Sequence, residues 1–351
     1  MKKLVIFSPD SVHLVNYLQL IDGYFDSILV ITDGQNPSIS ISLPYPTEKI
    51  NFSIKNPLRN RRQILHLKKT ITNFQPDLIH LHNIGTGAYL LEEAVRDLNV
   101  PKVATAWGSD VLVAPKRSFI FRKIVQHVLQ NFDAFTCDAL FMAYEMEKLS
   151  TKPLDIQIAN FGVESVDVRR APKENIIYSN RLHNPLYRID LIVDLFLEYK
   201  SRNPHDTWKL IVAATGSETE LLKQKVAQSP FNEFIEFVGW IDAAQNQSWY
   251  QKAKIYVSIP RSDGTSISLL EAMAHGCVPI VSNLPANNEW ITDGFNGIVY
   301  KGKSTLPFDA AMQLDAEKCA QINREIIALH GLKSSNRSKF IAIYDQLLAK
   351  K

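Results

Sequence analysis

Short apolar runs alternate with helical patterns along the whole chain, and this alternation restricts the possible folds more than any other feature. The runs of the first half cover residues 4–7, 27–31, 78–81 and 102–105. Those of the second half cover residues 176–178, 209–213, 235–239, 255–258 and 279–282. Between them lie stretches with apolar residues at helical spacing, such as 87–98 and 189–200. Strands that alternate with helices predict α/β domains with parallel sheets and helices on both faces.

A length of 351 residues exceeds one ordinary hydrophobic core and predicts two domains. The polar stretch 164–175 separates the two series, so we expect one Rossmann-like domain over residues 1–165 and a second over 166–333. Residues 334–351 predict an amphipathic C-terminal helix that packs back towards the first domain. Two doubly wound domains in tandem predict a central cleft, with ligands beyond the carboxyl ends of the strands.

The composition predicts a cytoplasmic protein. A hydrophobic fraction of 46% and a charged fraction of 21% are typical of a soluble globular chain. The apolar runs are far shorter than the about 20 residues that span a bilayer, and the first residues indicate a buried strand rather than a secretory signal. Cys137, Cys277 and Cys319 are odd in number and lack C-x-x-C spacing, which disfavours disulfides and zinc.

Several ligand motifs are missing from the sequence. No G-x-G-x-x-G follows the first strand and no P-loop motif occurs, which excludes nicotinamide and ATPase functions. Without a D-x-D motif, which would place two oxygens on one cation, a metal is not expected. The net charge is only +3 and no nucleic-acid-binding module is visible, so nucleic acid is not an expected partner.

The stretch 261–276 carries the strongest signal for a ligand site. A strand ends at Pro260, a glycine turn follows, and a helix is expected from Ser266 to Gly276. Backbone N–H groups at a helix start have no intrahelical acceptor, and the helix dipole favours negative charge there. The amides expected to point out of this helix are those of Gly264, Thr265, Ser266 and Ile267. They would meet a diphosphate or the polar edge of a sugar.

Two acids flank this helix start. Asp263 lies just before the helix, and Glu271 follows eight residues later. A carboxylate can accept two hydroxyl hydrogen bonds, so each acid suits one vicinal diol, one on a sugar and one on a ribose.

Five motifs together resemble a known family. Asp263, seven residues and then Glu-Ala-Met-Ala-x-Gly resemble the E-x7-E signature of the retaining glycosyltransferases of family four, which have the GT-B fold. The other four are Pro-Asp-Leu-Ile-His-Leu-His at 76–82, Gly-Ser-Asp at 108–110, Asn-Phe-Gly-Val-Glu at 160–164 and Asn-Arg-Leu at 180–182. The resemblance covers most of the chain.

The resemblance implies a metal-independent retaining glycosyltransferase that uses a UDP or GDP sugar as donor and no further cofactor. The first domain would bind a glycan or lipid-linked acceptor, and the second would bind the nucleotide sugar. Synthesis of bacterial surface polysaccharide or lipopolysaccharide is the associated role. Two alternatives stay open: another enzyme on this architecture, such as a sugar-nucleotide epimerase, and a non-catalytic partner that binds nucleotide sugar.

The resemblance also implies roles for individual residues. In that family the first acid binds the donor sugar and the second binds the ribose, which assigns Asp263 and Glu271. An Arg and a downstream Lys offset the charge of the departing diphosphate. Arg181 matches the Arg and joins Asp263 as a catalytic candidate, and Arg188 lies one place from the position of the Lys. Alternatives are a helix cap for Asp263 and a surface acid for Glu271.

Two further loops offer donor contacts. Thr215 and Gly216 end a strand and are expected near the phosphates or the sugar. Trp240 follows another strand and would either stack on the nucleobase, worth about 1–3 kcal/mol, or anchor one domain to the other.

The largest departure from the family lies in the first domain. Its motif H-G-S-D reads Trp107-Gly108-Ser109-Asp110 here. Transfer on the front face of the sugar needs no protein nucleophile, so either electrostatics and positioning suffice without the His, or the site is crippled. Asp110 is the acid expected to face the acceptor, and His82 and His13 are further candidates on the acceptor side. His80, inside a strand, is expected in the core.

Two basic segments, 56–74 and 118–132, interleave apolar residues with Lys and Arg. They would dock on anionic lipid at the inner face of the cell membrane, at about 1 kcal/mol per base. The alternative is ordinary amphipathic helices packed on the sheet with a solvated basic face.

Overall fold

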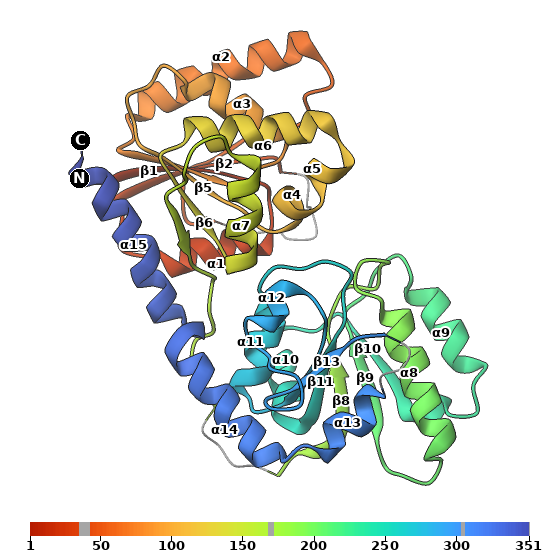
Figure 1. The fold of residues 1–351 in the computed structure, drawn as a ribbon. Coiled ribbons are helices and arrows are strands. Elements are labelled where there is room, and N and C mark those ends of the chain that lie inside the picture. Colours follow the sequence, from red (N-terminus) through yellow and green to blue (C-terminus); the bar gives the residue numbers. More distant parts are fainter. Residues whose placement is uncertain (35–42, 168–171, 303–305, 351) are drawn as a thin grey trace. The chain divides into compact units, whose positions relative to one another are not determined.

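A computed structural model describes residues 1–34, 43–167, 172–302 and 306–350 (Figure 1). Contacts divide the chain into two compact units, which we call unit 1, Met1–Phe161 with Lys333–Lys351, and unit 2, Gly162–Leu332. The boundaries expected from the sequence, after residues 165 and 333, lie within four residues of these points.

Unit 1 contains a seven-stranded parallel sheet in the order β3-β2-β1-β4-β5-β6-β7. The strands are β1 (Lys3–Ser8), β2 (Ser27–Thr32), β3 (Thr47–Lys49), β4 (Leu78–His82), β5 (Lys102–Thr105), β6 (Ala134–Cys137) and β7 (Ile156–Ile158). The central strands are buried on both faces, which explains their continuous runs of Val, Ile and Leu.

Helices cover both faces of this sheet. On one side α1 (Val12–Leu20) contacts α15 (Lys333–Ala349). On the other side α2 (Pro57–Phe74), α3 (Thr86–Val95) and α6 (Phe119–Asn131) form a row (Figure 1). The remaining helices are α4 (Ser109–Leu112), α5 (Ala114–Arg117) and α7 (Leu140–Leu149). In the part of the chain that the structure describes, no helix is long and apolar enough to cross a membrane.

Unit 2 contains a six-stranded parallel sheet in the order β10-β9-β8-β11-β12-β13. The strands are β8 (Glu174–Ser179), β9 (Lys209–Ala213), β10 (Ile235–Gly239), β11 (Ala253–Ser258), β12 (Val278–Ser282) and β13 (Ile298–Tyr300). The expected pair of doubly wound, parallel α/β domains is therefore confirmed.

The helices of unit 2 form two layers. Contacts group α8 (Ile189–Arg202) with α9 (Thr219–Ala227) and α13 (Pro307–Gln313), and α10 (Ala243–Lys252) with α11 (Ile267–Ala274) and α14 (Ala316–Ile326). The short helices α12 (Pro285–Asn288) and η1 (Asn232–Phe234) and the π-helical turn η2 (Ile327–Gly331) complete the unit.

The strand order creates one switch point in each unit. In unit 2 the chain leaves β8 towards β9 on one side and later returns to β11 on the other, so β8 and β11 are neighbours. In unit 1 the corresponding neighbours are β1 and β4. Ligands of such sheets bind beyond the carboxyl ends of the strands at these points. The loops that follow β8 and β11 are therefore where a site is expected.

Candidate functional site

An arginine–aspartate pair occupies the switch point of unit 2. Arg181 lies two residues after β8, and Asp263 lies in the loop between β11 and α11. Arg181 Nη2 donates to Asp263 Oδ2 at 2.8 Å, and its Nη1 donates to the hydroxyl of Ser266. The guanidinium carbon lies 4.3 Å from the centre of the Tyr187 ring. Only 11% of the Arg181 side chain and 20% of that of Asp263 are exposed.

Each member of this pair sets the charge of the other. Burial would lower the pKa of Arg181, but the Asp263 carboxylate raises it, so the guanidinium stays charged. Burial raises the pKa of Asp263, and the Arg181 charge and the Gly264 amide oppose that rise. The pair is thus a desolvated cation and acid at the start of α11.

The glycine turn leads directly into α11. The helix runs over Ile267–Ala274, slightly shorter than expected, and Ser266 is its N-cap. Because the cap is Ser266, Asp263 does not have the capping role considered as an alternative. Gly264, Thr265 and Ser266 are buried, and the Trp290 indole N–H donates to Thr265 Oγ1 at 3.1 Å. The turn is therefore held firmly beside Arg181.

Glu271 lies on α11 and is partly buried rather than a solvated surface acid. Asn246 Nδ2 donates to its Oε2 at 3.3 Å. Burial raises the pKa of Glu271, and the hydrogen bond from Asn246 opposes the rise. The acid thus lies against Asn246 of α10.

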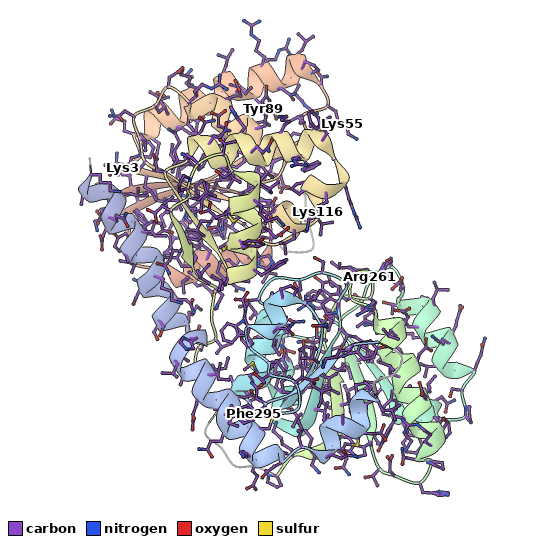
Figure 2. All side chains as sticks on the ribbon, in the orientation of Figure 1. Lys3, Lys55, Tyr89, Lys116, Arg261 and Phe295 are labelled. Atoms are coloured by element: carbon purple, nitrogen blue, oxygen red, sulfur yellow. The ribbon has the colours of Figure 1, made fainter. Side chains whose placement is uncertain are left out.

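Arg188 precedes α8 in a left-handed conformation, with φ of 53°. Its Nε donates to the carbonyl of Ile259 at 2.7 Å, just beyond the end of β11. Burial and the neighbouring charge of Arg261 lower the pKa of Arg188. Two cations thus lie near each other at this end of the sheet. Arg261, which Figure 2 labels, was given no role from the sequence, although its position shortly after β11 was a signal for one.

The loop after β9 carries Thr215 and Gly216. A Cβ on Gly216 would lie 2.3 Å from the carbonyl oxygen of His183, so only glycine fits there. The amide of His183 donates to the Thr215 carbonyl at 3.2 Å, and its ring Nδ1 lies 2.9 Å from Thr219 Oγ1. Gly216 therefore packs against the chain segment that follows Arg181. The buried His183 was not predicted from the sequence, although it lies in the Arg-Leu-His run at 181–183.

Trp240 follows β10 directly after Gly239, whose φ of 72° turns the chain. Trp240 is 70% exposed. Its face is accessible, and both of its predicted roles stay predictions.

In unit 1 the structure places Asp110 in the interior. It is 4% exposed, and burial raises its pKa against several opposing backbone hydrogen bonds. The backbone N–H groups that donate to its two oxygens are those of Ile84, Trp107, Gly108 and Val111. Asp110 thus joins the loops after β4 and β5, and this arrangement corrects the expectation that its carboxylate faces an acceptor.

His82, Trp107 and His13 form a cluster beyond β4. The Trp107 indole N–H donates to His82 Nδ1 at 3.4 Å, and the ring centres of His13 and Trp107 are 4.7 Å apart. His13 is exposed, whereas His82 is fully buried, and burial lowers its pKa well below the ordinary value. His82 is therefore a neutral interior side chain rather than an exposed acceptor contact.

His80 lies in the core of unit 1, as expected, bonded to Tyr17, Thr105 and Tyr344.

One group among the described residues has metal-ligand spacing: Glu92, Glu93 and His127 on α3 and α6. Arg96 forms ion pairs with both carboxylates, so a guanidinium occupies the place that a metal ion would take.

Fold and site together define a class. Two parallel α/β units, one with an arginine–acid pair beside a helix N-terminus at its switch point, have the arrangement in which doubly wound folds bind phosphorylated ligands. The family described as "Glycosyl transferases group 1" matches residues 173–314, and the family described as "Glycosyl transferase 4-like" matches residues 3–139. Together these matches cover more than three quarters of the chain, which belongs to the glycosyltransferases that they describe.

Curated relatives are similar over limited stretches. The GtfA subunit of UDP-N-acetylglucosamine–peptide N-acetylglucosaminyltransferase from Streptococcus pneumoniae is 27% identical over 152 residues, 43% of this chain and 29% of the relative. GDP-mannose:cellobiosyl-diphosphopolyprenol α-mannosyltransferase of Xanthomonas campestris is 26% identical over 134 residues, 37% of this chain and 34% of the relative. The chain therefore matches about a third of these relatives' length.

Solved structures share the fold over the full length. HepE of Anabaena in complex with UDP has a TM-score of 0.81 at 12% identity, over 99% of this chain and 100% of that chain. Sucrose-phosphate synthase of Thermosynechococcus elongatus has a TM-score of 0.81 at 14% identity, over 100% of both chains.

Proposed function

We propose that the protein is a metal-independent, retaining glycosyltransferase that moves a sugar from a nucleotide-diphosphate donor to a glycan or lipid-linked acceptor. The observation that carries this proposal is the contact of Arg181 with both Asp263 and Ser266 at the start of α11. It brings together a cation for a diphosphate, an acid for sugar hydroxyls and a helix N-terminus for phosphate oxygens, from the loops after β8 and β11.

The donor would lie along the carboxyl end of the unit 2 sheet. Arg181 and Arg188 would bind the diphosphate together with the amides of residues 264–267. Asp263 would accept hydroxyls of the sugar, and Glu271 would accept those of the ribose. Thr215 and Gly216 border the same edge of the sheet, and Trp240 offers an exposed face for the base. UDP is the favoured nucleotide, because solved structures of HepE and of pneumococcal GtfA contain UDP.

The reaction would depend on positioning and charge rather than on a protein nucleophile. As the bond between the sugar and the diphosphate breaks, negative charge grows on the leaving phosphate oxygen. Arg181 lies in a partly buried site, where a fixed cation stabilises that charge more strongly than in water. Asp263 keeps Arg181 oriented until the donor arrives, and then its oxygens can turn to the sugar hydroxyls.

Titration with nucleotides and assay of turnover test this proposal. We expect UDP and its sugars to raise the melting temperature, and UDP-sugar to be transferred or slowly hydrolysed with retention, visible as the α or β signal in proton NMR. Absence of binding to UDP, GDP and their sugars would refute the proposal.

A non-catalytic binding partner is the second candidate, favoured by Trp107 in place of the family's histidine. Binding of UDP-sugar without transfer or hydrolysis across an acceptor screen would establish this reading instead.

For the acceptor we propose unit 1, in the cytoplasm at the inner face of the cell membrane. Phe119 and Ile120 begin α6 and are 73% and 62% exposed. The exposed bases around them are Lys116, Arg117, Arg122 and Lys123. Exposed apolar side chains with Lys and Arg around them suit an anionic lipid surface that carries a lipid-linked acceptor.

Flotation with vesicles tests the membrane contact. Vesicles of phosphatidylglycerol should carry the protein upward, and neutral phosphatidylcholine vesicles should not. The double variant Phe119→Ser, Ile120→Ser should lose flotation, whereas Leu221→Ser, an exposed leucine on α9 in unit 2, should keep it. Equal recovery with both lipids would remove the idea.

A further inference from the structure

Asn180 is the first residue after β8 and directly precedes Arg181. Its side chain is tied into unit 2 by three hydrogen bonds. Nδ2 donates to Asn246 Oδ1 at 2.9 Å and to the Tyr250 hydroxyl at 2.7 Å. Oδ1 accepts from the Tyr256 hydroxyl at 3.1 Å. Asn180 therefore connects the end of β8 to α10 and β11, which a glycine could not do.

Asn246 continues this network to Glu271. Its Oδ1 accepts from the Tyr178 hydroxyl at 2.6 Å as well as from Asn180. An amide has one accepting and one donating end, so these two bonds direct Nδ2 to Glu271 Oε2, 3.3 Å away. The orientation of Asn246, and with it the donor presented to Glu271, therefore follows from Asn180 and Tyr178 together.

Tyr250 supports the same acid from a second side. Its hydroxyl donates to the carbonyl of Ser268 at 3.1 Å, in the first turn of the helix that carries Glu271. Burial raises the pKa of Tyr250 well above its ordinary value, so the phenol keeps its proton. Both the helix and the carboxylate are thus fixed by one set of buried hydrogen bonds.

We propose that Asn180 and Asn246 are positioning residues that orient the Glu271 carboxylate towards the ribose hydroxyls and so set the preference for a ribonucleotide. This inference rests on the proposed function. Asn246 holds one oxygen of the carboxylate, so the carboxylate cannot rotate. Its other oxygen then accepts a ribose hydroxyl in a fixed direction. Arg181 follows Asn180 directly and binds Asp263, so one short turn positions both acids.

Calorimetric titration of the full-length protein with UDP and with 2′,3′-dideoxy-UDP tests the inference. For the unsubstituted protein we expect UDP to bind about tenfold more tightly, as hydrogen bonds to a charged group allow. Asn246→Ala should reduce this ratio by about threefold or more, towards that of Glu271→Ala, and change the affinity for dideoxy-UDP by less than about twofold. Gln247→Ala, an exposed neighbour on α10, is the matched control and should keep the full ratio.

Asn180→Gly, which removes the amide that donates to Asn246, is the second variant and should lower the ratio in the same direction. Equal weakening of UDP and dideoxy-UDP would mean that the asparagines only support the fold, and an unchanged ratio would mean that they do not orient Glu271. Either result overturns the inference. Failure of the proposed function looks different: the unsubstituted protein then binds neither UDP nor GDP, or Glu271→Ala keeps the full ratio.

Discussion

At the scale of residues, the candidate site depends on charges that are taken out of water in pairs. Arg181 and Asp263 keep each other ionised in a partly buried place, whereas Glu271 has only neutral hydrogen-bond donors beside it. Removing one member of the pair leaves an unpaired charge, and neutralising Glu271 removes a charge that burial penalises. The two acids should therefore respond in opposite ways to substitution.

Asp263→Ala should weaken binding of UDP-sugar by about tenfold or more, because the sugar hydroxyls lose a charged acceptor. UDP without a sugar should bind as tightly as before or more tightly, since the Asp263 carboxylate no longer competes with the diphosphate for Arg181. The unpaired guanidinium should cost up to about 3 kcal/mol of stability. Titration calorimetry measures the two affinities, and urea unfolding measures the stability. Asp309→Ala breaks a more exposed pair with Arg202 in the same unit and should cost at most about 1 kcal/mol.

Glu271→Gln should raise the melting temperature near neutral pH and weaken the binding of UDP. Burial raises the pKa of Glu271 above its ordinary value of 4.5, so the folded protein holds a proton that the unfolded chain has already lost. The stability contributed by this group is therefore lost as pH rises from 4.5 through the folded pKa. The gain in Glu271→Gln should be present at about pH 8 and absent at about pH 4 in thermal scans. An equal gain at both pH values would contradict the charge argument.

At the scale of elements, the loop between β9 and α9 holds the segment that follows Arg181. Gly216 approaches the His183 backbone too closely for any side chain, and Thr219 binds the His183 ring. The short edge strands β3, β7 and β13 and the four-residue strand β6 were not predicted, because so few residues carry little pattern. The central strands were predicted within a residue or two, since burial on both faces demands continuous apolar runs.

Gly216→Ala should lower stability by about 1–3 kcal/mol, because the new methyl group must displace the His183 backbone. The displacement should also weaken the binding of UDP, since His183 lies two residues after Arg181. Ser217→Ala, at the exposed neighbouring position, is the control and should change neither quantity. Normal stability of Gly216→Ala in urea unfolding would show that the loop yields more easily than its packing indicates.

At the scale of the whole molecule, the last helix belongs to unit 1 although it follows unit 2 in the sequence. Phe340 and Tyr344 on α15 are buried in the core of unit 1, and the Tyr344 hydroxyl bonds to His80. The chain thus closes the first unit only after the second is complete.

Phe340→Ala should lower the melting transition of unit 1, since removing a buried phenylalanine costs about 3–5 kcal/mol. The transition that UDP raises should keep its temperature. Phe196→Ala removes an equally buried phenylalanine in unit 2. It should lower the transition that UDP raises and leave the transition of unit 1 unchanged. Calorimetric scans with and without UDP resolve the two cases. A UDP-dependent transition that falls with Phe340→Ala would contradict the assignment of α15 to unit 1.

The sequence by itself determined the alternation of strands and helices, the two sheets and the motif around Asp263, because these depend on residues that are close together in the chain. Only the tertiary structure decided that Arg181 meets Asp263 across 82 residues, that Asp110 binds four backbone amides, and that His82 is buried. The physical reason is that burial and hydrogen-bond partners are set by which strands become neighbours. A local pattern predicts a strand but contains no information on the loop that will lie beside its end.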